Sequence, residues 1–229
     1  MNNQLPLSLQ APENASFDNF IVGQNQQLIF SLLDDNEQLI FLWGEHHSGK
    51  SHLLQAMVEH YRNLGLNCLY IPLQVNDDGS PELSYELLTG LEEMDLLCLD
   101  DIHNIISEPQ WEEALFHFFN RIRDNKGRLV LSANANAVNL DIHLNDLKSR
   151  LSWGLTYQCQ ALSDDDKVKA LQLRAQQRGF SLTDDVVRYL LTHVSRSMLE
   201  LMVLLDKLDY ESLVEQRKIS IPFIKKYLP

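Results

Sequence analysis

Cysteine is scarce in this 229-residue sequence, which contains only Cys68, Cys98 and Cys159. No two of them form a C-x-x-C pair, and this spacing argues against a zinc site. Each lies in a strand-like apolar stretch, which is typical of a reduced core thiol in a cytoplasmic protein. The sequence also has no run of about 18 apolar residues, so we expect no membrane-spanning helix. Its N-terminus lacks the positive and apolar segments of a signal peptide.

Basic residues are few as well, with 19 Lys and Arg against 32 Asp and Glu, for a net charge of −13. Binding duplex DNA through the general surface requires a basic face, so the composition argues against that function. Hydrophobic residues make up 45% of the chain and charged residues 22%, which is ordinary for a globular protein with its own core.

The stretch from Gly44 to Ser51 fits the phosphate-loop pattern G-x-x-x-x-G-K-[ST]. An apolar strand-like run, 39–43, precedes it and a helix-like stretch, 52–63, follows it, as the motif requires. In such loops the lysine reaches the terminal phosphates and the hydroxyl of the last residue holds Mg²⁺. The predicted phosphate-binding residues are Gly44, Ser48, Gly49, Lys50, Ser51 and His52. The plain alternative is a glycine-containing turn with a solvated lysine.

A second nucleotide signature is the apolar run 96–99 followed by Asp100 and Asp101. Asp100 is predicted to hold Mg²⁺, and Asp101 to orient or activate the attacking water. The alternative is a buried strand that ends in a solvated turn. Many ATPases carry glutamate at the second position, so the shorter Asp101 leaves hydrolysis by this chain itself open. After the next strand-like run, Asn134 is predicted to sense the terminal phosphate, although a capping role fits equally well.

Alternating strand-like and helix-like stretches predict an α/β fold with a doubly wound, five-stranded parallel sheet. The predicted strands are 39–43, 68–71, 96–99, 128–132 and 153–157. One helix is predicted before the first strand, over 25–33, and the helices between the strands include 52–63, 82–91 and 111–123. From residue 162 the pattern becomes helical only, with Ser163 and Thr183 as caps and Gly179 as a stop. The predicted division is a flexible tail over 1–15, a nucleotide-binding domain over 16–159 and a small helical lid over 160–229.

Leucines alternate with proline and serine in the N-terminal stretch from Gln4 to Leu9, so an extended backbone puts Leu5, Leu7 and Leu9 on one side. The pattern is equally compatible with packing on the chain's own core and with a peptide ligand for a partner's groove. Arg150 precedes the last strand, where the local sequence alone favours a structural ion pair.

Together these motifs resemble the AAA+ ATPases of the bacterial initiator clade, the family of the replication initiator DnaA. The segment from Phe17 to Gly23 resembles the clade's adenine-side lead-in, which assigns Ile21 and Val22 to nucleotide binding. Asp100-Asp101-Ile102 is similar to its magnesium strand, and Ser149–Thr156 resembles its arginine-finger box. The stretches 162–175 and 216–223 resemble the lid of a regulatory member.

This resemblance implies a negative regulator of replication initiation that binds ADP or ATP with Mg²⁺. Arg150 is then a finger offered in trans to ATP on DnaA, which makes the chain a promoter of its partner's hydrolysis. The hexapeptide from Gln4 to Leu9 is similar to a motif that binds the sliding clamp, the β subunit of DNA polymerase III. The clade also implies self-association through the interface between finger and nucleotide.

Two departures from the clade bear on this interpretation. The lid arginine that contacts phosphates in the initiator aligns with Leu199, and Arg196 lies about one helical turn earlier. The absence of this lid arginine favours a bound diphosphate and weak or absent ATPase activity. The initiator's helix-turn-helix module also has no counterpart here, so we expect no intrinsic sequence-specific DNA-binding domain. The competing interpretations are an autonomous ATPase resembling a helicase loader and an adaptor tethered to the clamp.

Overall fold

The structure is a computed structural model, and it describes residues 15–34 and 36–227. The strands are β1 (Leu39–Trp43), β2 (Cys68–Pro72), β3 (Leu96–Asp100), β4 (Arg128–Ala133) and β5 (Leu155–Gln158). The α-helices are α1 (Gln26–Leu33), α2 (Lys50–Asn63), α3 (Pro109–Asp124), α4 (Asn145–Trp153), α5 (Asp164–Gln177), α6 (Asp184–His193), α7 (Met198–Glu215) and α8 (Ile221–Tyr227). Short 3₁₀ helices are η1 (Phe17–Asn19), η2 (Tyr85–Leu88), η3 (Leu91–Glu93) and η4 (Ile102–Asn104).

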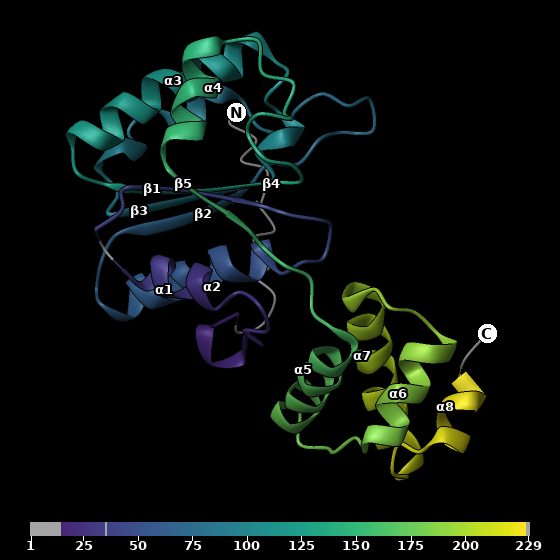
Figure 1. Ribbon diagram of the computed structural model, residues 1–229. Helices are drawn as coiled ribbons and strands as arrows, with labels where there is room; N and C mark the ends of the chain where they lie inside the picture. The colour runs from purple at the N-terminus through teal and green to yellow at the C-terminus, as the bar shows by residue number, and fades with distance from the viewer. Residues whose placement is uncertain (1–14, 35, 228–229) are drawn as a thin grey trace, which may run out of the picture.

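The five strands form one parallel sheet in the order β2-β3-β4-β1-β5, with helices on both faces (Figure 1). Side chains alternate along β1, as the strand period requires. Leu39 and Phe41 join the core beneath α3 and α4, whereas Ile40 and Leu42 join the core above α1 and α2. An apolar run is therefore needed in every central strand, because both faces of the sheet are buried. The prediction of a doubly wound, five-stranded parallel sheet is confirmed.

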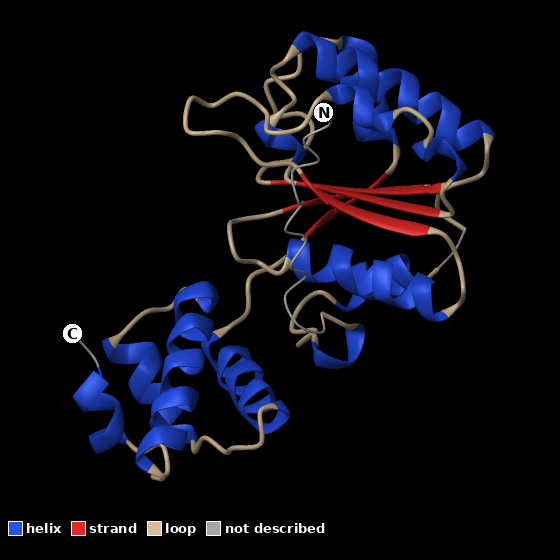
Figure 2. Ribbon diagram, turned by 180° about the vertical axis from the view of Figure 1, so that it is seen from behind, coloured by secondary structure: helices blue, strands red, loops and turns tan. Residues whose placement is uncertain are grey.

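The parallel register brings the predicted nucleotide signatures to the carboxyl ends of the strands. Figure 2 shows these strands side by side in one sheet between two layers of helices. Four strand ends lie at this carboxyl edge of the sheet, where Trp43 of β1 pairs with Ala133 of β4 and Pro72 of β2 pairs with Asp100 of β3. The phosphate loop follows Trp43 directly, so it lies beside the carboxyl end of β4 and one strand away from the end of β3. Ligands of open α/β sheets bind at this edge.

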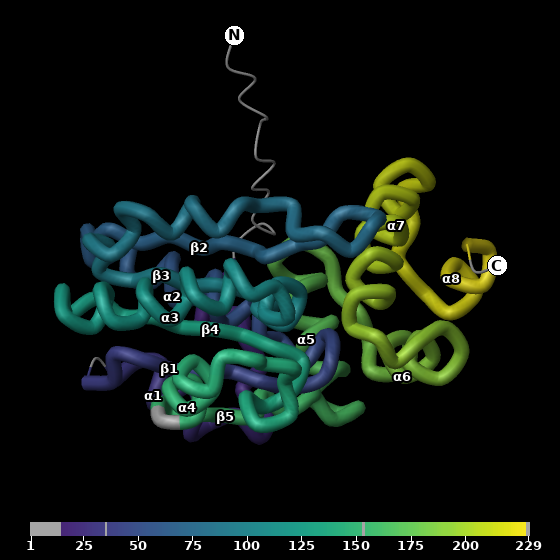
Figure 3. Tube along the Cα trace, turned by 90° about the horizontal axis from the view of Figure 1, so that it is seen from above, coloured from purple at the N-terminus to yellow at the C-terminus, as the bar shows by residue number. Residues whose placement is uncertain are grey.

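Helices α5 to α8 pack around a core of their own, to one side of the sheet (Figures 1 and 3). Ser163 caps α5 by accepting a hydrogen bond from the Asp166 backbone amide at 3.2 Å, and Gly179 ends the same helix with φ of +86°. Thr183 occupies the predicted cap position of α6, but its side chain makes no capping hydrogen bond. None of the helices in the described ranges has the length and apolar character needed to cross a membrane.

Two predicted elements differ from the structure. The helix predicted over 82–91 is two 3₁₀ turns, η2 and η3, because Gly90 between them adopts φ of +86°. The strand predicted over 153–157 begins only at Leu155. Gly154 ends α4 against Leu39, where a Cβ atom would lie 2.5 Å from the Leu39 side chain. This close approach turns the chain from α4 into β5.

Candidate functional site

The phosphate loop joins β1 to α2 in the predicted strand–loop–helix setting. Two glycines make its path possible. A Cβ on Gly44 would lie 2.5 Å from the Cys159 carbonyl oxygen, and Gly49 has φ of +102° with the Phe20 ring 2.9 Å from any Cβ. Because α2 begins at Lys50, its first amides have no partner within the helix. A helix N-terminus of this kind attracts anions, so the backbone forms an anion cradle.

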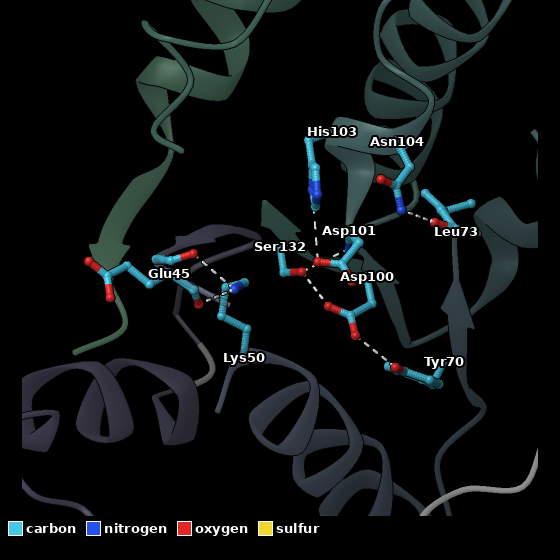
Figure 4. A network of polar contacts seen from close by, with 10 residues as sticks. Glu45, Lys50, Tyr70, Leu73, Asp100, Asp101, His103, Asn104 and Ser132 are labelled. Atoms are coloured by element: carbon cyan, nitrogen blue, oxygen red, sulfur yellow. Dashed lines mark hydrogen bonds and ion pairs between the residues drawn. The ribbon is translucent and has the colours of Figure 1, made fainter. Parts of the chain in front are cut away.

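Lys50 points back into this cradle (Figure 4). Its side chain is buried, and Nζ donates to the carbonyl oxygens of Gly44 and Glu45, both at 2.9 Å. An ammonium group has three N–H donors, so one remains for a phosphate oxygen. The buried hydroxyl of Ser48 has no hydrogen-bond partner within the described residues. The donors of this loop therefore fit a phosphate group.

Asp100 ends β3 and is almost fully buried, with both carboxylate oxygens engaged (Figure 4). The Tyr70 hydroxyl donates to Oδ2 at 2.7 Å, and the Ser132 hydroxyl donates to Oδ1. Ser132 Oγ in turn accepts a hydrogen bond from the Asp101 backbone amide at 2.9 Å. Tyr70 and Ser132 were not among the predicted site residues. The local sequence gives one indication of Ser132, because it is a polar residue that directly follows three apolar residues of β4.

Magnesium is the metal that the sequence predicted at this edge of the sheet. Within the part of the chain that the structure describes, no group of three or more His, Cys, Asp or Glu residues is arranged to hold a metal ion. Mg²⁺ commonly keeps several waters and binds one or two protein groups together with substrate phosphates. The Ser51 hydroxyl and the Asp100 carboxylate are oxygen donors of that kind, so they fit Mg²⁺ that arrives with a nucleotide.

Asp101 lies beside His103 of η4, and His103 in turn lies beside His46 of the phosphate loop. His103 Nδ1 is 3.8 Å from Asp101 Oδ1, and the ring of His46 is 6.2 Å from that of His103. Burial, and next the charge on Asp100, raise the pKa of Asp101. Burial, and next the charge on His46, lower the pKa of His103. A carboxylate with a raised pKa accepts a proton from water more readily, which is compatible with the role predicted for Asp101.

The lead-in segment lies against the loop and the first turns of α2. The ring of Phe20 is 5.3 Å from that of His52, and His52 Nε2 is 3.0 Å from the Ser16 carbonyl oxygen. Burial is the main cause that lowers the pKa of His52. Ile21 is half-buried and Val22 is exposed directly after Phe20. Phe20 therefore holds this segment against the phosphate loop, and the assignment of Ile21 and Val22 to the adenine stays a prediction.

Asn25 ties this lead-in segment to the connection between β5 and α5. Its buried side chain donates to the Gln160 carbonyl oxygen at 2.9 Å and accepts from the Gln160 amide at 2.7 Å. A Cβ on Gly23 would lie 3.4 Å from Asp166 Oδ2 of α5. The lid therefore begins beside the predicted adenine side. Sequence analysis missed Asn25, whose partner is 135 residues away.

Among the described residues, no contact brings Asn134, Leu199 or Arg196 to the phosphate loop. Asn134 is exposed after β4, and its side chain makes no hydrogen bond with the described residues. Leu199 is 56% exposed at the start of α7. Arg196 Nη2 lies 3.4 Å from Asp164 Oδ2, so this arginine pairs within the lid. Its role as a substitute for the missing lid arginine stays a prediction.

Arg150 lies on α4, where its guanidinium carbon is 5.3 Å from the centre of the Phe116 ring and 5.4 Å from that of Phe119. It lines a cavity of about 160 Å³ together with Leu39 and Leu129, which lie at the amino ends of β1 and β4. No ion pair to Arg150 is formed by the residues that the structure describes. Stacking on two aromatic rings therefore holds this cation.

This placement separates Arg150 from the chain's own phosphate loop. The arginine lies near the amino end of β1, and the loop follows its carboxyl end, about 13 Å away along four residues of strand. Helix α4 also covers the opposite face of the sheet from α2 (Figure 1). Arg150 is therefore directed away from a nucleotide bound to the same chain.

Glu112 fixes the start of the helix that carries Arg150. The residue at the cap position of α4 is Leu144, which has no side-chain acceptor. The buried carboxylate of Glu112, on α3, accepts from the His143 amide at 2.9 Å and from the Leu144 amide at 2.6 Å. A carboxylate at a helix N-terminus also interacts favourably with the helix dipole. The sequence analysis missed this residue.

Glu112→Gln is expected to lower the free energy of unfolding by about 2–4 kcal/mol, because an amide replaces one acceptor with a donor that faces backbone N–H groups. Chemical denaturation followed by circular dichroism measures the change. Glu113→Gln is the matched control, since Glu113 is exposed on the same helix. Equal stability of the two variants would contradict the capping role of Glu112.

The residues predicted to bind a clamp, Gln4, Leu5, Leu7 and Leu9, lie outside the described part of the chain.

Two families match separate parts of the chain. Residues 164–228 match the family described as Hda, lid domain, and residues 82–158 match the family described as bacterial DnaA ATPase domain. A Haemophilus influenzae protein described as uncharacterized is 40% identical over 233 residues, which cover 100% of this chain and 99% of that protein. The present chain and this relative therefore share one family over their whole common length.

Solved structures of DnaA share the fold. Domain III of DnaA from Thermotoga maritima aligns with a TM-score of 0.78 at 19% identity, over 93% of this chain and 94% of that chain. DnaA from Aquifex aeolicus bound to AMPPCP aligns with a TM-score of 0.68 at 22% identity, over 88% of this chain and 68% of that chain. At these identities the likeness establishes the α/β fold with its helical lid.

Proposed function

This chain belongs to the DnaA-related AAA+ family, within the group that carries the Hda lid, and from that membership we propose that it is a negative regulator of replication initiation. In this proposal it stimulates hydrolysis of ATP bound to DnaA and so leaves the initiator in its ADP form. The DNA-loaded sliding clamp supplies the place where the two proteins meet.

The nucleotide of the chain itself is proposed to be ADP, or ATP, with Mg²⁺. Support comes from the anion cradle, from the spare donor of Lys50 and from the AMPPCP that a solved DnaA of the same fold holds. Ser51 and Asp100 would hold the ion, and Ile21 and Val22 would border the adenine. Bound Mg²⁺ would neutralise charge on the phosphate oxygens.

The placement of Arg150 is the observation that carries the trans mechanism. The side chain is fixed by Phe116 and Phe119 on the layer opposite α2, where it cannot reach a phosphate on its own loop. A guanidinium offered to another subunit can instead stabilise the charge that develops on a transferring phosphoryl group. The partner's ATP is therefore the proposed substrate, and self-association through the same face is proposed with it.

Autonomous ATP hydrolysis is the second candidate, and the environment of Asp101 favours it. This carboxyl directly follows β3 and lies 3.8 Å from His103 of η4, which suits a proton acceptor for attacking water. A third candidate, an adaptor tethered to the clamp, needs no contribution from Arg150 or Asp101.

The test is hydrolysis of ATP preloaded on DnaA, measured with DNA-loaded clamp in the presence and absence of this protein. Acceleration that requires both the protein and the clamp supports the regulator. Hydrolysis of free ATP by the protein alone, with the ATP on DnaA untouched, would instead establish the autonomous ATPase.

A chain lacking residues 1–9 is expected to lose the clamp-dependent part of this acceleration, because Leu5, Leu7 and Leu9 are proposed to fill an apolar groove on the clamp. Binding to immobilised clamp and hydrolysis on DnaA would be measured in parallel. The double variant Leu5→Ala with Leu7→Ala serves as the control for chain length, because it removes the leucine side chains and keeps all residues of the tail. Unchanged clamp binding by both variants would exclude the tail as the tether.

A further inference from the structure

Tyr70 occupies a place in the candidate magnesium site that no sequence motif assigns. It lies on the edge strand β2, where the sheet register pairs it with Cys98 of β3. From there its hydroxyl reaches forward to Asp100 Oδ2 at 2.7 Å (Figure 4). The remainder of its ring packs against the core beside α2.

The carboxylate of Asp100 is held from two sides. Ser132 on β4 donates to one oxygen and Tyr70 on β2 donates to the other, and these strands flank β3. With one donor on each oxygen, the carboxylate cannot rotate about its terminal bond without breaking a hydrogen bond. Each oxygen keeps a lone pair for a further donor, such as a metal-bound water.

Tyr70 is suited to remain a donor in this position. A phenol hydroxyl is protonated at neutral pH, so Tyr70 donates its hydrogen bond to Asp100. Mg²⁺ requires near-ideal octahedral geometry and gives up its waters reluctantly. A carboxylate fixed in one orientation suits such an ion better than one free to turn.

We propose that Tyr70 is a positioning residue of the magnesium site, which sets the orientation of Asp100 toward the water shell of a nucleotide-bound Mg²⁺. The proposal rests on the nucleotide binding inferred above. It assigns to the edge strand β2 a part in cation binding, although β2 contributes no residue to the phosphate loop.

Tyr70→Phe tests this assignment, because it removes the hydroxyl and keeps the ring. The affinity for fluorescently labelled ADP would be measured in EDTA and across a Mg²⁺ titration. We expect an unchanged affinity in EDTA and a rise of about 10–100-fold in the Mg²⁺ concentration at half-maximal effect, the usual consequence of losing a partner of a metal ligand. Tyr157→Phe is the matched control, since that hydroxyl contacts Ser31 at 2.6 Å in the core around α1.

A double-mutant cycle with Asp100→Asn establishes whether Tyr70 acts through Asp100. Asp100→Asn combined with Tyr70→Phe is expected to require no more Mg²⁺ than Asp100→Asn alone. Additive effects, an unchanged Mg²⁺ requirement in Tyr70→Phe, or an equal loss of affinity in EDTA would each overturn the proposal. Absence of nucleotide binding by the wild type would be a separate result, which overturns the proposed function and this inference with it.

Discussion

Arg150→Ala is expected to reduce the stimulated hydrolysis of ATP on DnaA by about 10³–10⁵-fold, the range that a finger arginine contributes to phosphoryl transfer. Among the described residues, the guanidinium stacks on the rings of Phe116 and Phe119 and forms no ion pair. Removing it leaves the phosphate loop of this chain untouched, so binding of labelled ADP to the variant should equal that of the wild type. Single-turnover hydrolysis on preloaded DnaA measures the loss.

The control for this variant is Arg62→Ala, which removes an exposed arginine from α2 on the other face of the sheet. Arg62 forms a surface ion pair with Glu59, and such pairs contribute little to stability. Arg150→Lys adds a second comparison, because an ammonium keeps the charge but loses the planar, multiple-donor geometry of guanidinium. Stimulation by Arg150→Ala within tenfold of the wild type would exclude the trans finger and favour the adaptor.

The parts of the fold that were predicted correctly are each encoded by a contiguous stretch of sequence. The loop from Gly44 to Ser51 is contiguous, and its two glycines lie where a Cβ atom would clash with a neighbouring residue. The run 96–100 is buried throughout because β3 lies inside the sheet, so its apolar pattern is continuous until Asp100. A parallel sheet then brings such strand ends together without further information.

The residues that sequence analysis missed act through contacts between distant segments. Arg128 begins an apolar strand, and a charged residue at such a position is usually exposed. In the structure it is buried and donates to the carbonyl oxygens of Ser31 and Asp34. Glu112 resembles any acidic residue on a solvated helix face, but its carboxylate accepts the His143 and Leu144 amides and so caps α4. Tyr70 reads as core. In each case the partner is at least 30 residues away, and a single sequence carries no signal for that pairing.

Lys50→Met is expected to weaken nucleotide binding by about 100-fold, because it removes charge-assisted hydrogen bonds that together contribute about 3 kcal/mol. Methionine keeps the buried stem of the side chain, so the variant tests the ammonium and not the packing. The free protein loses only the contacts of Nζ with the Gly44 and Glu45 carbonyl oxygens. Titration with labelled ADP measures the affinity, and Lys207→Met on the exposed face of α7 is the control.

Thermal unfolding of the Lys50→Met variant separates the role of the nucleotide from that of the loop. A ligand that binds only the folded state raises the unfolding temperature in proportion to the logarithm of its concentration over Kd. Wild type and Lys207→Met should therefore be stabilised by added ADP, whereas Lys50→Met should not respond at the same concentration. If Lys50→Met binds and responds like the wild type, the phosphate does not lie on this loop. If it loses nucleotide but still stimulates DnaA through Arg150, the nucleotide of this chain only stabilises the fold, and the trans reaction depends on the α3–α4 layer alone.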